Sequence, residues 1–127
     1  MDELTTLYRP VGKTELALIQ AGGWTAFPPR LAHQPIFYPV LNEAYAREIA
    51  EKWNTKDEQS GYEGFVTKFF VRTDFVRQFP SKQVGDKQHS ELWIPAQCLE
   101  EMNQNIVGKI EVIAEFRGTL AATEPKS

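Results

Sequence analysis

The chain has 127 residues, of which 42% are hydrophobic and 24% charged, and this much hydrophobic material is enough to fill one core. No apolar run approaches the roughly 20 residues that are needed to cross a bilayer. One cysteine and two histidines exclude a disulfide framework and a cysteine-rich zinc site, and we expect no metal ion. The net charge of −3 argues against a dedicated nucleic-acid-binding module, so we expect no stable nucleic-acid complex.

The first part of the chain predicts a strand, a helix and a long loop. Leu4–Val11 is rich in β-prone residues and reads as a strand. Thr14 is placed to cap a helix over residues 15–21, which Gly22 would end. Residues 22–35 contain two glycines and three prolines, and a loop of this length is often functional.

The middle of the chain predicts a short strand at 36–40 and the clearest helix, at 43–53, with Asn42 as its cap. The apolar positions of this helix recur every four residues and predict a buried face; they are Tyr45, Ile49 and Trp53. Its polar side carries two favourable (i, i+4) ion pairs, Glu43–Arg47 and Glu48–Lys52.

The remaining elements follow from alternation and from helix-breaking residues. Further strands are expected at 65–72, 91–94 and 110–117. A single helical turn after Thr73 would pack Phe75 against Phe79, and a longer helix at 96–106 would end before Gly108. Residues 82–89 are polar and are expected to be irregular.

These elements predict an α+β fold with small, mostly antiparallel sheets and short helices, over a single domain at residues 1–118 and a frayed tail at 119–127. The strands alternate as half-buried antiparallel strands do, and the glycine-rich phosphate loops of parallel α/β proteins are absent from the sequence. The first residues lack the apolar segment of a secretory signal, so we expect a cytoplasmic protein.

Three residues stand out as candidates for chemistry. Arg9 lies within the first strand, either as a surface arginine paired with a carboxylate or as a donor fork for a ribose or phosphate oxygen. Tyr38 faces away from Phe37 and is either a further core aromatic or a stacking surface. Glu91 is charged, yet it shares a strand face with Trp93, so it lies at the solvated end of that strand or serves a function.

The order of these segments resembles the ADP-ribosyltransferase-like fold. The resemblance rests on Tyr-Arg in the first strand, on IFYP leading into YAREIAEKW, and on HSELWIP leading through LEEMNQNIVGKIEV. The last segment is similar to the closing part of small bacterial transferases of the DarT type. The whole chain resembles short bacterial proteins labelled ADP-ribosylation/crystallin J1.

The resemblance implies an NAD-binding cleft between two small sheets. Arg9, with Tyr8 beside it, would match the first-strand residue that holds a ribose or phosphate group, and Tyr38 would match the residue next to the nicotinamide. Glu91 would match the catalytic glutamate, which accepts a hydrogen bond from the ribose 2′-hydroxyl while oxocarbenium character develops. ADP-ribose would then pass from NAD to an acceptor that the sequence leaves open: protein, nucleic acid, small molecule or water.

Two further residues complete the expected site. His89 stands two positions before Glu91, where many relatives carry Gln or Glu, and it is a general base, an acceptor-orienting group or a simple loop histidine. The loop at 23–34, with Arg30, would close over the nucleotide. The alternatives are a non-catalytic nucleotide- or protein-binding module on the same fold and an RNA 2′-phosphotransferase, which the acidic balance disfavours. We expect a monomer or a weak dimer.

Overall fold

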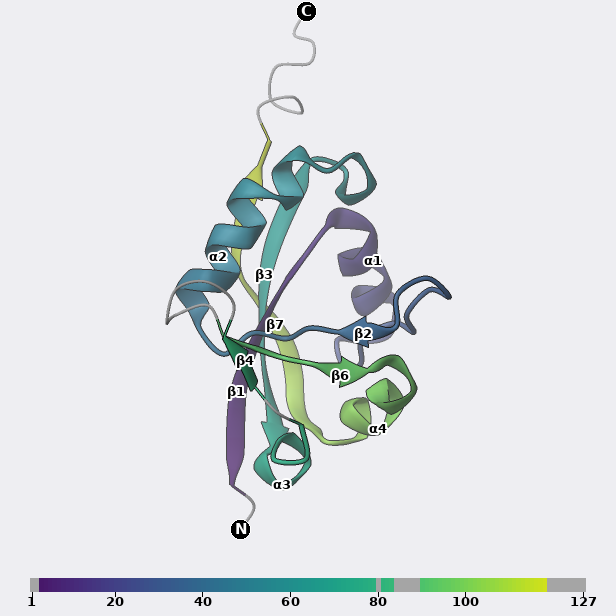
Figure 1. Ribbon diagram of the computed structural model, residues 1–127. Helices are drawn as coiled ribbons and strands as arrows, with labels where there is room; N and C mark the ends of the chain where they lie inside the picture. Colours follow the sequence, from purple (N-terminus) through teal and green to yellow (C-terminus); the bar gives the residue numbers. More distant parts are fainter. Residues whose placement is uncertain (1–2, 80, 84–89, 119–127) are drawn as a thin grey trace, which may run out of the picture.

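In the computed structural model, residues 3–79, 81–83 and 90–118 are described. The predictions for His89 and for the tail at 119–127 therefore fall outside the described residues. The predicted α+β class is confirmed, since small antiparallel sheets are combined with short helices (Figure 1).

A three-stranded antiparallel sheet in the order β1–β3–β7 forms the centre of the fold. Its strands are β1 (Leu4–Val11), β3 (Glu63–Arg72) and β7 (Ile106–Arg117). β1 pairs with β3 over its whole length without a register shift. The pairing of β3 with β7 shifts register twice, so the outer strand β7 is bulged.

The start of β7 differs from the prediction. The expected helix at 96–106 is a 3-10 turn, η3 (Ala96–Cys98), followed by a short helix, α4 (Leu99–Gln104). Gly108 lies inside β7 instead of ending a helix, and its positive φ of 81° allows the strand to bulge there. The bulge brings the Ile110 N–H to within 2.7 Å of the Trp24 carbonyl oxygen in the long loop.

A second layer crosses the central sheet. Residues 35–41 run antiparallel to residues 90–96 and form a ribbon, which contains β2 (Ile36–Phe37) paired with β6 (Ile94–Pro95). Figure 1 shows this ribbon running across the strands of the central sheet. The strand β5 (Ser90–Leu92) also pairs with β4 (Ser81–Gln83), which forms where the sequence predicted irregular chain.

One residue of the ribbon connects it to the central sheet. Val40 forms antiparallel bridges both to Tyr8 of β1 and to Glu91 of β5. The Tyr8 and Val40 amides exchange hydrogen bonds of 2.9 and 2.7 Å with each other's carbonyl oxygens. The three segments that carry the predicted site are therefore neighbours.

Helix α2 (Glu43–Lys52) largely follows its prediction. The Tyr45 N–H donates a 3.0 Å hydrogen bond to the Asn42 side chain, so the predicted cap is confirmed. Both (i, i+4) ion pairs are present, at 2.8 Å for Glu43–Arg47 and 3.6 Å for Glu48–Lys52. Trp53 was expected on the buried face but is 68% exposed, because the helix ends at Lys52 and the chain turns into η1 (Asn54–Lys56).

The helix α1 (Lys13–Ala21) begins earlier than predicted. Gly12, which has no side chain to donate or accept, is its N-cap, so Thr14 lies inside the first turn and does not cap the helix. The Thr14 hydroxyl instead donates to the Gln59 carbonyl oxygen at 3.4 Å, next to η2 (Glu58–Ser60). In α3 (Thr73–Val76), the predicted contact of Phe75 with Phe79 is confirmed, with ring centroids 5.0 Å apart.

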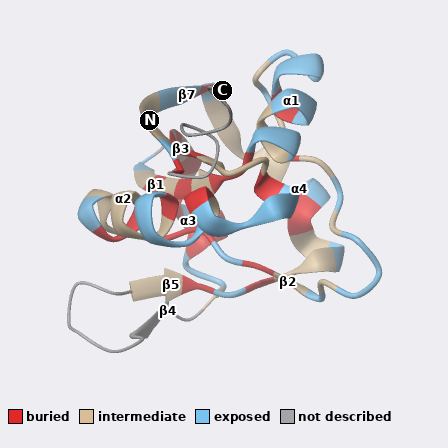
Figure 2. Ribbon diagram, turned by 90° about the horizontal axis from the view of Figure 1, so that it is seen from above, coloured by how far each residue is buried: buried red, intermediate tan, exposed pale blue. Residues whose placement is uncertain are grey.

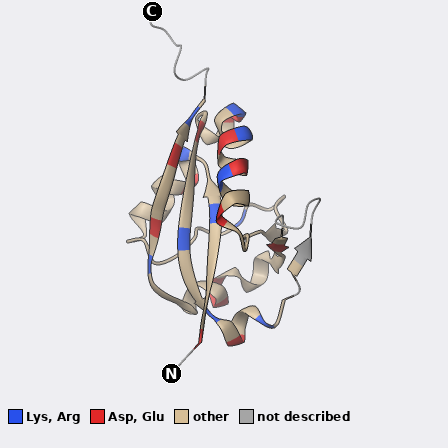
Figure 3. Ribbon diagram, turned by 90° about the vertical axis from the view of Figure 1, so that its left-hand side faces the viewer, with Lys and Arg blue, Asp and Glu red and all other residues tan. Residues whose placement is uncertain are grey.

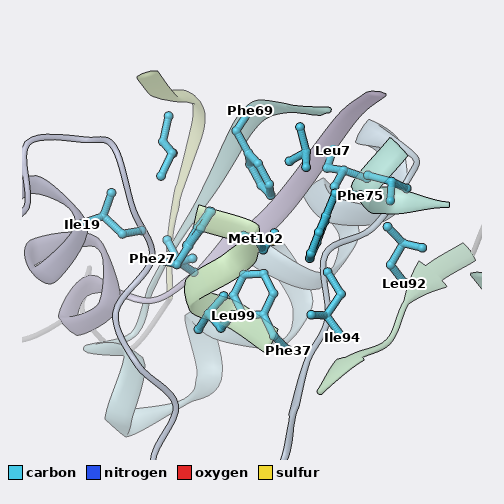
Figure 4. Packing of buried hydrophobic residues seen from close by; sticks show 14 of the residues in the cluster. Leu7, Ile19, Phe27, Phe37, Phe69, Phe75, Leu92, Ile94, Leu99 and Met102 are labelled. Atoms are coloured by element: carbon cyan, nitrogen blue, oxygen red, sulfur yellow. The ribbon is translucent and has the colours of Figure 1, made fainter. Parts of the chain in front are cut away.

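The central sheet has a core on each face. The larger core lies between the sheet and the layer of α1, the ribbon and α4, and Figure 4 shows its side chains pointing toward one another. The smaller core lies between the sheet and α2; its buried members are Val40, Tyr45, Ala46, Ala50 and Val66. Figure 2 shows that α2 turns buried residues toward the sheet and exposed ones outward. No helix among the described residues is long and apolar enough to span a bilayer.

Candidate functional site

The carboxylate of Glu91 accepts hydrogen bonds from two side chains that belong to different parts of the fold. The phenol of Tyr45, on α2, donates a 2.6 Å hydrogen bond to Glu91 Oε2. The indole N–H of Trp93, on the ribbon, donates a 3.1 Å hydrogen bond to Glu91 Oε1. The carboxylate is therefore fixed in orientation from both sides, as a group with a defined task needs to be.

Tyr45 remains a protonated donor in this arrangement. It is 8% exposed, and burial raises the pKa of its phenol, with a further rise from the hydrogen bond to Glu91 and the negative charge there. The phenol therefore keeps its proton at neutral pH. Sequence reasoning missed this residue, because its helical spacing indicated a core position and nothing local pointed to Glu91.

An exposed aromatic pair lies beside Glu91. The rings of Tyr38 and Trp93 meet edge to face, with centroids 5.8 Å apart and an interplanar angle of 86°. Each residue remains 38% exposed, whereas their ribbon neighbours Phe37 and Ile94 are fully buried. Side chains alternate along a strand, so the ribbon turns one face to the large core and presents these two aromatics on the other, with Glu91.

The guanidinium of Arg9 already has hydrogen-bond partners within the protein. Its Nε and one terminal nitrogen donate to the two carboxylate oxygens of Glu15 at 2.7 and 3.0 Å, and its guanidinium carbon lies 4.4 Å from the centroid of the Phe37 ring. The other terminal nitrogen lies 3.4 Å from the Tyr38 carbonyl oxygen. Of the two alternatives for Arg9, the structure contains the carboxylate pair.

The predicted site is divided between the two faces of the ribbon. Tyr8 packs against the smaller core, on the side of Tyr45 and Glu91. Arg9, the next residue along β1, turns to the opposite side, as does Arg30, whose guanidinium carbon lies 5.8 Å from the centroid of the Phe37 ring. The structure thus brings Glu91 close to Tyr45, Trp93 and Tyr38, and places the two arginines together elsewhere.

The surroundings carry mixed charge. Figure 3 shows acidic and basic residues interspersed along the strands and α2. In the part of the chain that the structure describes, no group of three or more His, Cys, Asp or Glu side chains lies close enough to hold a metal ion. Among the described residues, the groups beside the Glu91 carboxylate include two exposed aromatic rings and a protonated phenol.

Comparisons with protein-family models, with curated proteins and with solved structures each found no match to this chain. The function proposed for it therefore rests on its sequence and on the geometry of the site.

Proposed function

We propose that this protein cleaves the nicotinamide–ribose bond of NAD at Glu91 and transfers ADP-ribose to an acceptor. The observation that carries the proposal is the Glu91 carboxylate, held between Tyr45 and Trp93 beside an exposed aromatic pair. Val40, two residues after Tyr38, forms an antiparallel bridge with Glu91, so the segment that carries Tyr38 lies beside that of Glu91.

The aromatic pair suits the part of NAD that leaves. The nicotinamide ring of NAD is flat and positively charged, and aromatic faces attract such a ring. Tyr38 and Trp93 are both exposed and both on the face of Glu91, so a ring against them would bring the adjoining ribose to the carboxylate.

The carboxylate suits the transition state. When the bond from ribose C1′ to the ring nitrogen breaks, nicotinamide leaves with the bonding electron pair, and the ribose gains oxocarbenium character. A carboxylate that accepts a hydrogen bond from the 2′-hydroxyl stabilises this positive charge more than it stabilises bound NAD. A nucleophilic oxygen, nitrogen or sulfur atom of the acceptor then bonds to C1′ and loses its proton.

Arg9 has a different role in this proposal from the one that the resemblance implies. Its donors are engaged by Glu15 and by the Tyr38 carbonyl oxygen, and it points away from the Glu91 carboxylate. We assign it to positioning, because it links β1 to α1 and to the backbone of the ribbon at Tyr38.

Nicotinamide release from NAD tests the proposal. We expect release by the purified protein or by the protein with cell extract added, the second result indicating a macromolecular acceptor. Glu111→Gln, an exposed substitution on β7, should leave release unchanged, whereas Glu91→Gln should lower it about a hundredfold.

A second function follows if NAD binds but no nicotinamide is released. Both oxygens of Glu91 already accept hydrogen bonds within the protein, which favours a binding module in which the carboxylate holds the ribbon against α2. Calorimetric binding of NAD without turnover, in the presence and absence of extract, would overturn the catalytic proposal and support this one.

A further inference from the structure

A pocket of about 390 Å³ lies on the other side of the ribbon from Glu91. It is bounded by the end of β1, by the start of α1, by residues 28–34 of the long loop and by the turns η1 and η2. Both arginines that the structure places away from Glu91 line it, and so does Glu15. Arg30 and Glu15 have no part in the proposed reaction, and Arg9 enters it only through its contact with the Tyr38 backbone.

Arg30 brings an unsatisfied donor to this pocket. Its Nε is buried without a hydrogen-bond partner, and no ion pair among the described residues includes Arg30. Burial and the charge of Arg9 lower its pKa, and the charge of Glu15 raises it by less, so the cationic form is only partly compensated there. A buried donor without a partner is costly, and an anionic ligand would supply that partner.

The pairing of charges, rather than their sum, indicates a ligand with one negative charge. The lining carries two arginines and two acids, and Arg9 is matched by Glu15 in a two-point ion pair. Asp57, the second lining acid, accepts hydrogen bonds from the Gln59 amide and the Ser60 hydroxyl. Arg30 is therefore the lining cation without an ion pair among the described residues, and a carboxylate matches the fork of a single guanidinium in charge and geometry.

One side of the pocket is apolar. Leu18 of α1 and Leu31 of the loop both line it, and they are 52% and 60% exposed. Pro28 and Pro29 add further apolar surface. Two large exposed leucines at one pocket indicate that a ligand with an apolar body would bury them.

The loop that carries Arg30 is held in place. The Phe27 N–H donates to Asn103 Oδ1 at 2.9 Å, and Asn103 Nδ2 donates to the Phe27 carbonyl oxygen at 3.1 Å. The Phe27 ring also packs against Phe37 and Phe69, with centroids 5.1 and 4.8 Å away. Arg30 follows this anchor by three residues, so its position is set before a ligand arrives.

We propose that this pocket binds a small monocarboxylate with an apolar body, its carboxylate on Arg30 and its apolar part against Leu18 and Leu31. A second pocket, of about 460 Å³, shares Arg30 but also contains Glu100, which has no ion pair among the described residues and would repel a carboxylate, whereas Glu15 is paired with Arg9. The ligand therefore lies on the side of Leu18. The inference goes beyond the proposed function and does not depend on it, because the pocket and Glu91 lie on different sides of the ribbon.

Titration of the whole chain with hexanoate, followed by amide and arginine Nε NMR signals, tests the inference. We expect saturable shifts at Leu18, Leu31 and Arg30. Two compounds serve as controls: hexan-1-ol has the same six-carbon chain without the charge, and inorganic phosphate has negative charge without an apolar chain. Both should bind at least about tenfold more weakly, a difference of about 1.4 kcal/mol.

Two variants and a control complete the test. Arg30→Gln should weaken hexanoate binding at least about tenfold without loss of thermal stability, since Arg30 has no ion pair to lose among the described residues. Leu18→Ser should weaken hexanoate but not phosphate, and Arg117→Gln, an exposed control, should change neither. The inference is overturned if hexanoate causes no shifts at millimolar concentration, if hexan-1-ol or phosphate binds equally well, or if Arg30→Gln binds hexanoate normally.

Discussion

The phenol of Tyr45 donates a 2.6 Å hydrogen bond to the carboxylate of Glu91 across 46 positions of sequence. This contact joins the well-formed helix α2 to a strand of only three residues, β5. Strands this short have little stability of their own, so the position of Glu91 depends on the helix above it. In the proposed reaction Tyr45 is therefore a positioning residue.

Tyr45→Phe removes that contact with little change in shape. We expect the free energy of unfolding to fall by about 1–2 kcal/mol, and nicotinamide release to fall about tenfold through kcat rather than KM. Steady-state kinetics with a urea titration measures both. Tyr62→Phe is the matched control and should leave kcat unchanged; an equal loss of kcat in the two variants would contradict the positioning role.

The raised pKa of Tyr45 predicts a loss of stability in alkali. A group whose pKa is higher in the folded than in the unfolded chain stabilises the fold fully below its unfolded pKa, near 10 for tyrosine. That contribution is lost as the pH rises above about 10 toward the folded value. Thermal unfolding from pH 8 to 12 should therefore show a steeper fall for the wild type than for Tyr45→Phe. Parallel curves would show that the shift is absent.

The ion pair of Arg9 and Glu15 should matter to stability because it is largely removed from water. The two side chains are 10% and 21% exposed, and Glu15→Gln would leave the guanidinium under-compensated. We expect a loss of about 2 kcal/mol in a urea titration. Glu115→Gln removes the partner of Arg117 in a pair exposed at 47% and 66%, and it should cost less than about 0.5 kcal/mol.

Gly64 marks the closest approach of α2 to the sheet. A Cβ at this position would collide with the Ala50 carbonyl oxygen and with the Asn54 side chain, so Gly64→Ala should push α2 outward and cost about 1–3 kcal/mol. At Gly22 a Cβ would lie 3.6 Å from its nearest neighbours and φ is −87°, so Gly22→Ala should be neutral or slightly stabilising. Equal losses in a urea titration would contradict this account of the packing.

The elements set by local signals agree with the sequence predictions. Strand β1 has the predicted bounds, Leu4–Val11, because a run rich in β-prone residues ends at a glycine. The cap at Asn42 and the ion pairs of α2 involve residues three or four apart, which the sequence displays directly. The alternation at Glu91 is confirmed by β5, whereas the strand predicted at 36–40 is only Ile36–Phe37, so Tyr38 follows the strand.

Features that depend on distant segments escaped prediction. The sequence predicted a strand in each half of the ribbon, but the pairing of residues 35–41 with residues 90–96 joins segments far apart in the chain, which no local pattern displays. Arg9 and Glu15 meet only because α1 turns back against β1, and Gly108 continues a strand only because β3 lies beside it. The partner of Glu91 was hidden for the same reason, since Tyr45 has the helical spacing of a core residue.

Nicotinamide release by Glu91→Gln, measured beside its thermal unfolding, tests the central proposal most directly. Glutamine keeps the size of the side chain and an oxygen that can accept from Tyr45, and it loses only the acceptor of the exposed Trp93 indole, so the melting temperature should change little. The account predicts an approximately hundredfold loss of release at nearly unchanged stability. Full release by the folded variant would contradict a catalytic role for Glu91.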